Sequence, residues 1–210
     1  MLRVIGDIHG NYKKYGQLIS LARQSICVGD MGFDYKPLNQ FDPTNHKIIG
    51  GNHDNYDIID MVPHNLGDYG VFESIIGPIF FIRGAWSIDR AYRTAGVDWW
   101  EAEQLSYYQL QSAIKAYRAS QAPIIITHEA PLSLVPHVTN PEIARSFGYD
   151  DIVPTRTNLA LDTIYQTKPP KLWVFGHYHT NRVIQGNCMA ICVGETRAID
   201  IINENIIEWI

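Results

Sequence analysis

Short apolar runs and amphipathic stretches alternate along the first part of the chain. Residues 2–6 and 25–28 are apolar runs, and residues 11–22 between them carry apolar side chains at helical spacing after Asn11, a suitable N-cap. Apolar runs of about four to eight residues are typical of buried strands, whereas helical spacing indicates an amphipathic helix. The order strand, helix, strand favours parallel pairing of the two strands.

Similar patterns continue through the rest of the chain. Asp98 and Glu101 resemble a capping box and predict the start of a long helix, while residues 131–158 are expected to form a long surface excursion, acting as a lid near the site. Further strands are expected at residues 47–50, 71–76, 79–82, 124–127 and 172–175, a helix at residues 158–166, and four short strands within residues 182–210, with turns at Gly77-Pro78, Gly186-Asn187, Gly194-Glu195 and Asn203-Glu204-Asn205.

Length and composition favour a compact enzyme. A chain of 210 residues with 46% hydrophobic and 19% charged side chains fits one domain, residues 1–210. No apolar run reaches the roughly 18 residues that span a bilayer, and the first strand begins at Leu2, so we expect a cytoplasmic protein without membrane contact. The net charge of −5 makes a long nucleic acid a less favoured partner.

Five polar motifs follow strand-like runs. Carboxylate, amide and imidazole groups are ligands that divalent transition metals favour, and side chains at strand ends converge in space. Each motif alone also fits an ordinary polar turn, but their joint occurrence in this order predicts a metal centre. The motifs are Asp7-Ile8-His9, Gly29-Asp30, Gly51-Asn52-His53-Asp54, Thr127-His128 and Gly176-His177-Tyr178-His179.

The ordered motifs resemble those of the calcineurin-like metallophosphoesterase superfamily, in particular its small bacterial and phage members. The resemblance implies an α/β fold, a four-layer α/β/β/α sandwich with the metal site at strand ends. It also implies that His53 is not a ligand and that Asp30 bridges two metals. By the same resemblance Asp7, His9 and His179 would hold one metal, and Asn52, His128 and His177 the other.

The ligand types explain the expected chemistry. Two divalent ions about 3.5 to 4 Å apart can activate a shared hydroxide and clamp the phosphate oxygens. The mixture of His, Asp and Asn suits transition metals, with Mn preferred and Fe or Zn as alternatives. His53, oriented by Asp54 or another carboxylate, is expected to protonate the leaving-group oxygen as a general acid.

The chain departs from the protein serine/threonine phosphatase branch of this superfamily. That branch continues its Gly-Asp motif with Asp-Arg-Gly, whereas this chain has Met31-Gly32-Phe33-Asp34, so the cation that contacts the phosphate is expected elsewhere. Candidates are Arg90 and Arg93, with Trp86 stacking on a ring of the substrate, and Arg182. The alternatives are a surface turn for residues 84–93 and a salt-bridged surface arginine at position 182.

The leading hypothesis is a hydrolase of phosphate monoesters. Its substrate would be a phosphorylated small molecule, a nucleotide or a phosphopeptide. A phosphodiesterase or nuclease with the same site is the alternative within the enzyme class. A non-catalytic protein-binding scaffold is disfavoured because every ligand position is filled. Composition does not indicate an oligomeric state.

Overall fold

A computed structural model describes residues 1–203 and 206–210. Its strands form two sheets with the orders β11-β10-β1-β2-β3 and β4-β5-β6-β7-β9-β8. The strands are β1 (Leu2–Ile5), β2 (Ser25–Cys27), β3 (His46–Ile48), β4 (Tyr69–Ser74), β5 (Gly77–Ile82), β6 (Ile124–Thr127), β7 (Leu172–Phe175), β8 (Arg182–Gln185), β9 (Met189–Cys192), β10 (Ala198–Asn203) and β11 (Ile206–Trp209).

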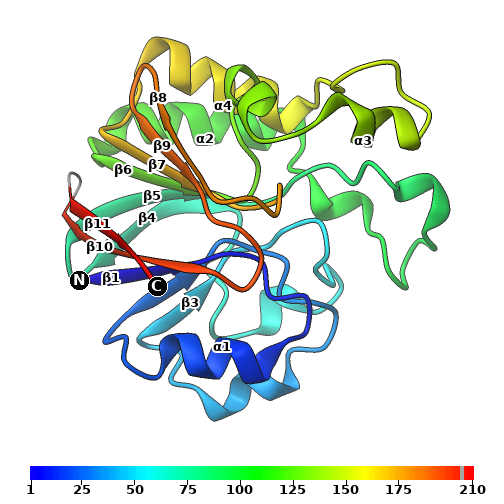
Figure 1. The fold of residues 1–210 in the computed structure, drawn as a ribbon. Coiled ribbons are helices and arrows are strands. Elements are labelled where there is room, and N and C mark those ends of the chain that lie inside the picture. Colours follow the sequence, from blue (N-terminus) through cyan, green and yellow to red (C-terminus); the bar gives the residue numbers. More distant parts are fainter. Residues whose placement is uncertain (204–205) are drawn as a thin grey trace.

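Helices cover the outer faces of both sheets (Figure 1). The α-helices are α1 (Tyr12–Ile19), α2 (Tyr107–Ser120), α3 (Pro141–Ser146) and α4 (Arg156–Thr167), and the 3₁₀ helices are η1 (Lys36–Gln40), η2 (Ile59–Met61), η3 (Arg90–Tyr92), η4 (Glu101–Glu103) and η5 (Leu132–His137). No described helix is both long enough and apolar enough to span a bilayer.

Three hydrophobic clusters define four layers. Alternate side chains of a strand point to opposite faces of its sheet, and so Val4 packs between the sheets whereas Ile5 packs against α1. In the second sheet Ile126 faces the first sheet, and Ile125 faces α2 and α4. The layers are therefore α1, first sheet, second sheet, and α2 with α4, as the α/β/β/α expectation requires.

The central strands of both sheets run parallel, as the first strand, helix and strand predicted. β1 pairs with β2 and β2 with β3 in one sheet, and β5, β6, β7 and β9 are parallel neighbours in the other. The carboxyl ends of β1, β2 and β3 approach those of β6 and β7, and their loops gather at one end of the sandwich, the right-hand side of Figure 1.

Two local predictions were wrong. The chain turns at Ile75 and Ile76 rather than at Gly77-Pro78, and Gly77 already pairs with Ser74. The long helix begins at Tyr107 rather than near Asp98, because Ser106 and Gln109 form the capping box, while the Asp98 carboxylate accepts from the backbone N–H of Thr94.

The other predicted boundaries lie close to those in the structure. Asn11 caps α1 by accepting from the N–H of Lys14, and the four short strands after residue 182 are present as β8 to β11. Residues 131–158 are a long excursion, but they contain η5 and α3. The expected turn at Asn203-Glu204-Asn205 lies partly outside the described residues.

Candidate active site

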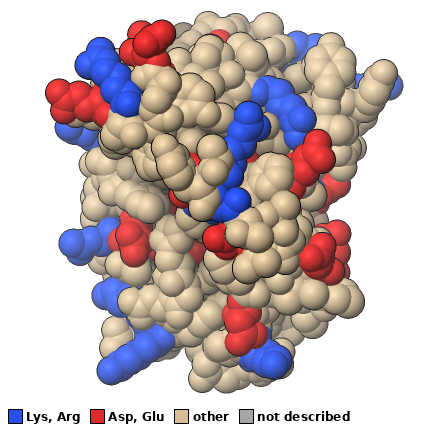
Figure 2. All heavy atoms as spheres, turned by 90° about the vertical axis from the view of Figure 1, so that its right-hand side faces the viewer, with Lys and Arg blue, Asp and Glu red and all other residues tan. Residues whose placement is uncertain are grey.

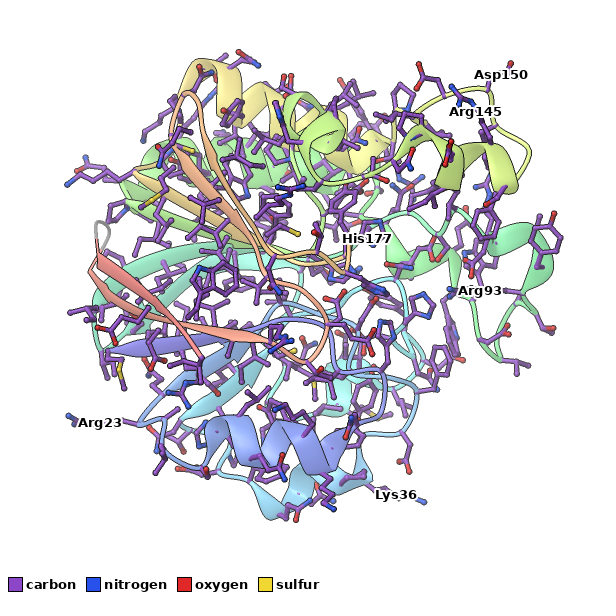
Figure 3. The ribbon with its side chains drawn as sticks, in the orientation of Figure 1. Arg23, Lys36, Arg93, Arg145, Asp150 and His177 are labelled. Atoms are coloured by element: carbon purple, nitrogen blue, oxygen red, sulfur yellow. The ribbon has the colours of Figure 1, made fainter. Side chains whose placement is uncertain are left out.

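The five motifs meet where the parallel strands of the two sheets end. β1, β2 and β3 lead to Asp7, Asp30 and Asn52, and β6 and β7 lead to His128 and His177. In Figure 3 His177 lies near the middle of the molecule, between the ribbons of the two halves. The two sheets therefore both contribute to one site.

One group of predicted ligands is closely packed. Ligand atoms of Asp7, His9, Asp30 and His179 all lie within 4.8 Å of one another. The Nε2 atoms of His9 and His179 are 3.1 Å apart, and the Asp7 Oδ2 atom is 3.3 Å from Nε2 of His179. Two imidazoles and two carboxylates that converge in this way form a donor set that fits a divalent transition metal.

A second group surrounds His128. The Nδ1 atom of His128 is 2.9 Å from the carbonyl oxygen of Val28, which leaves Nε2 to face Oδ1 of Asn52 at 3.1 Å and Oδ1 of Asp30 at 3.2 Å. The ring of His177 packs against that of His128, with centroids 5.1 Å apart. In the neutral ring, Nε2 carries the lone pair, so three acceptor atoms converge and favour a cation.

The charges around His128 also favour a cation at this position. Burial lowers the pKa of His128, but the carboxylates of Asp30 and Asp7 outweigh burial and raise it to about 10. This position therefore favours positive charge, which either a proton or a bound cation supplies.

The predicted ligands share an uncommon backbone conformation. Residues with side chains rarely adopt a positive φ, and such strain concentrates at functional sites. The angle φ is 46° at His9, 52° at Asp30, 68° at His177 and 50° at His179. Four of the expected ligands are thus held in the left-handed region by their loops.

The Asn52 amide is oriented by residues that the sequence patterns did not reveal. Its Nδ2 atom donates to Ser87 Oγ at 3.1 Å, and Ser87 donates in turn to Glu103 through its hydroxyl at 2.6 Å and its backbone N–H at 2.9 Å. This chain of bonds directs Oδ1 of Asn52 towards His128. No motif marks Ser87 or Glu103, and only the folded loop brings them to Asn52.

The Asp54 side chain organises the loops around the site. Its buried carboxylate accepts from the backbone N–H groups of Asp30 at 2.9 Å, Met31 at 3.1 Å and Gly51 at 2.7 Å, and from the Tyr35 hydroxyl at 2.9 Å. Asp54 thereby links the loops after β2 and β3. The expectation that it orients the His53 ring has no hydrogen bond to support it.

Arg93 lies against His53 instead. Its guanidinium group is 3.1 Å from Nδ1 of His53 and 2.8 Å from the Asp89 carboxylate, and Figure 3 shows it reaching in from the 84–104 segment. Burial lowers the pKa of His53, Asp30 opposes this effect, and Arg93 adds to it. At pH 7 the neutral form of His53 is therefore favoured.

The other predicted substrate contacts are less central. Trp86 lines the cavity beside the ligands, and Arg90 lies over the Trp86 ring at 5.2 Å. Arg182 is exposed at the start of β8, and within the described chain no hydrogen bond or ion pair joins it to the ligand cluster. Of the three candidate arginines, only Arg93 contacts one of the motif residues.

One family model matches most of the chain. The family model described as calcineurin-like phosphoesterase matches residues 2–181. The chain therefore belongs to the calcineurin-like phosphoesterase family, a classification that indicates a metal-dependent hydrolase of phosphate esters. No curated protein sequence matched the chain.

Two solved structures share the fold at low sequence identity. A putative 5'-nucleotidase from Staphylococcus aureus, solved with alpha-ketoglutarate, superimposes with a TM-score of 0.54 at 12% identity, over 95% of this chain and 50% of its own. The protein TT1561 of Thermus thermophilus gives a TM-score of 0.52 at 9% identity, over 99% of this chain and 97% of its own. The chain thus spans about half the length of the first neighbour.

Proposed function

We propose that the protein hydrolyses phosphate monoesters at a dinuclear metal centre, with manganese as the preferred metal. The observation that carries the proposal is the position of Asp30. Its Oδ1 atom lies 3.2 Å from Nε2 of His128, and its Oδ2 atom lies 3.7 Å from Nε2 of His9. One carboxylate therefore faces both ligand groups, which is the geometry that a bridging ligand needs.

In this proposal Asp7, His9 and His179 hold one ion, and Asn52, His128 and His177 hold the other. When bound, the two ions supply a water nucleophile of lowered pKa and neutralise charge on the phosphate oxygens. The chain keeps this donor set in place through the Asp54 carboxylate and the Ser87 hydroxyl, which fix the loops and the Asn52 amide.

His53 is the proposed proton donor to the leaving-group oxygen. Its ring lies edge-on to His9, with centroids 4.9 Å apart, and it lines the adjacent cavity. Donation requires the protonated ring, which an anionic phosphate group next to it would favour. Arg93, which is held by the Asp89 carboxylate, is the proposed phosphate contact. A guanidinium group can donate two parallel hydrogen bonds to two oxygens of one phosphate.

A small phosphorylated substrate is favoured. The Staphylococcus aureus neighbour is a putative 5'-nucleotidase. This supports a substrate of nucleotide size in preference to a large phosphoprotein. Manganese, iron and zinc all fit the donor types, and metal analysis of the purified protein distinguishes them.

Hydrolysis of two aryl esters tests the proposal. Metal-stripped protein is reloaded with Mn²⁺ and assayed on p-nitrophenyl phosphate and bis-p-nitrophenyl phosphate. We expect Mn-dependent turnover with preference for the monoester, and loss of bound metal and turnover in Asp30→Asn. The matched control, Asp60→Asn, changes an exposed carboxylate whose hydrogen bond is to Asn65. Preference for the diester would favour a phosphodiesterase. Absence of metal binding would support the alternative that the protein is a non-catalytic, protein-binding scaffold.

The His53→Ala variant tests the proton donor. It should retain metal but lose roughly 100- to 10,000-fold in kcat on an alkyl phosphate, whose leaving group needs a proton. On p-nitrophenyl phosphate the loss should be much smaller, because nitrophenolate departs without protonation. Equal losses on both substrates would contradict the general-acid role.

A further inference from the structure

A cavity of about 440 Å³ opens directly beside the ligand cluster. One side of it is formed by the polar side chains of Asp30, Asn52, His53, His177 and His179. A second hollow touches only His9 and His53 among the motif residues. A phosphate ester bound at the ligand cluster would therefore extend into the first cavity, and its volume lies within the range typical of small-molecule sites.

The rest of the cavity wall is predominantly apolar. It is built mainly from η5, α3 and the residues that follow them, and its apolar side chains are Val135, Ile143, Ala144, Phe147, Ile152 and Val153. Trp86 also lines the cavity and packs edge-on against Tyr149, with ring centroids 5.5 Å apart. Ile143 lines the cavity although 50% of its surface is exposed.

The polar groups of the wall are largely engaged with one another. The Thr155 hydroxyl donates to both carboxylate oxygens of Glu129, at 3.0 and 3.1 Å, and Thr155 also exchanges bonds with Asn158 across the start of α4. The side chains of Glu129 and Thr155 thus have few groups left for a ligand, and the Asn140 side chain caps α3. Burying a charged substrate group against them would leave that group without a partner.

The cavity lining offers little to a highly anionic leaving group. Among the described residues that line it there is no lysine or arginine, Asp89 is already paired with Arg93, and burial raises the pKa of the Glu129 carboxyl to about 8. Figure 2 shows charged side chains of both signs scattered over this side of the molecule, without a continuous basic surface. Additional phosphate or carboxylate groups on the alcohol part of the substrate would find no lysine or arginine among the described lining residues to pair with.

We propose that the cavity receives the alcohol part of the phosphate ester, and that this part is uncharged and predominantly apolar, an alkyl or aryl group. This inference rests on the proposed phosphoesterase function. His53 lines the cavity together with predicted ligands, so the leaving-group oxygen would face His53 with the apolar group directed at Phe147 and Ile143. Burial of each methylene group then contributes about fourfold in affinity.

A series of n-alkyl phosphates tests the inference, because their alcohols differ in apolar area but hardly in acidity. Binding of propyl, butyl and hexyl phosphate to Mn-loaded protein is measured by calorimetry, and turnover is measured in parallel. We expect hexyl phosphate, which has three more methylene groups, to bind about 60-fold more tightly than propyl phosphate. A terminal carboxylate on the hexyl chain should abolish this gain.

A matched pair of variants locates the effect. Ile143→Ser should reduce the preference for hexyl over propyl phosphate at least about threefold, whereas Leu159→Ser should leave it unchanged. Both side chains are 50% exposed, but only Ile143 lines the cavity.

The outcomes separate the two proposals. Equal affinity across the alkyl series, or tighter binding of adenosine monophosphate than of hexyl phosphate, would overturn the apolar pocket while p-nitrophenyl phosphate is still hydrolysed. Graded alkyl binding without turnover of any ester would support the pocket and contradict the phosphoesterase function.

Discussion

Glycines that precede the ligand motifs allow the loops to pack against one another. A Cβ atom on Gly29 would lie 2.4 Å from Nδ1 of His128, and one on Gly176 would lie 2.4 Å from Oδ1 of Asp7. Both distances are well below van der Waals contact. These glycines therefore belong to the site because another motif occupies the space of their missing side chains.

Gly51 offers the sharpest test of this packing. A Cβ at this position would lie 2.2 Å from Oδ1 of Asp30. We expect Gly51→Ala to weaken Mn²⁺ binding on the order of 100-fold and to destabilise the fold by about 1–3 kcal/mol, as measured by calorimetry and urea unfolding. Gly70→Ala is the control, because its nearest neighbour is Phe81 at 3.5 Å. Similar effects of the two substitutions would show that the contact with Asp30 is unimportant.

Among the elements, α2 shows how a tertiary contact can override a local signal. Asp98 and Glu101 have the spacing of a capping box, yet Glu101–Glu103 forms only the short helix η4. The buried Glu103 carboxylate accepts both hydrogen bonds from Ser87. This contact holds the segment beside the ligand cluster, and the helix starts at the next suitable cap, Ser106.

The Ser106→Ala substitution tests this assignment. The Ser106 hydroxyl accepts from the N–H of Gln109, and the Gln109 side chain accepts from the N–H of Ser106. Loss of the cap should lower the free energy of unfolding by about 1 kcal/mol, measured by urea denaturation. Gln109→Ala should cost part of this amount, whereas Asp98→Ala should leave the helix content by circular dichroism unchanged. A larger loss of helix in Asp98→Ala than in Ser106→Ala would instead support the prediction that the helix begins near Asp98.

At the scale of the whole molecule, the site joins the two sheets. Asp7 and Asp30 follow strands of the first sheet, and His128 and His177 follow strands of the second. Ligands from both sheets can converge only in the folded chain. Bound metal is therefore expected to stabilise the folded state.

Thermal unfolding measures this linkage. At a free Mn²⁺ concentration of about 100 times Kd, one bound ion adds about 2.7 kcal/mol to the free energy of unfolding, which corresponds to a rise in Tm of about 5–10 °C. Asp60→Asn should show the same rise, and Asp30→Asn should show little of it. An unchanged Tm in the unsubstituted protein would argue against selective binding of Mn²⁺ to the folded state.

Local patterns accounted for most of the architecture. Apolar runs such as residues 124–127 mark strands because a buried strand must be apolar on both faces, and the structure places Ile124–Thr127 in β6. The motif residues were visible because polar groups directly after such runs are unusual. By contrast, the turn at Ile75 and Ile76 was missed, since Gly77 starts a strand with φ 107° and gives the same sequence signal as a turn.

Hydrophobic periodicity, which is local along the chain, was enough to predict the order of most strands and helices. The ordered motifs indicated the family by resemblance and nominated the residues from which a metal site can be built. Only the tertiary structure brought Arg93 to His53, Ser87 to Asn52 and Asp54 to the backbone of Asp30. It also formed the apolar wall from residues 135–153, because contacts between distant segments depend on how the two sheets pack and no local pattern encodes them.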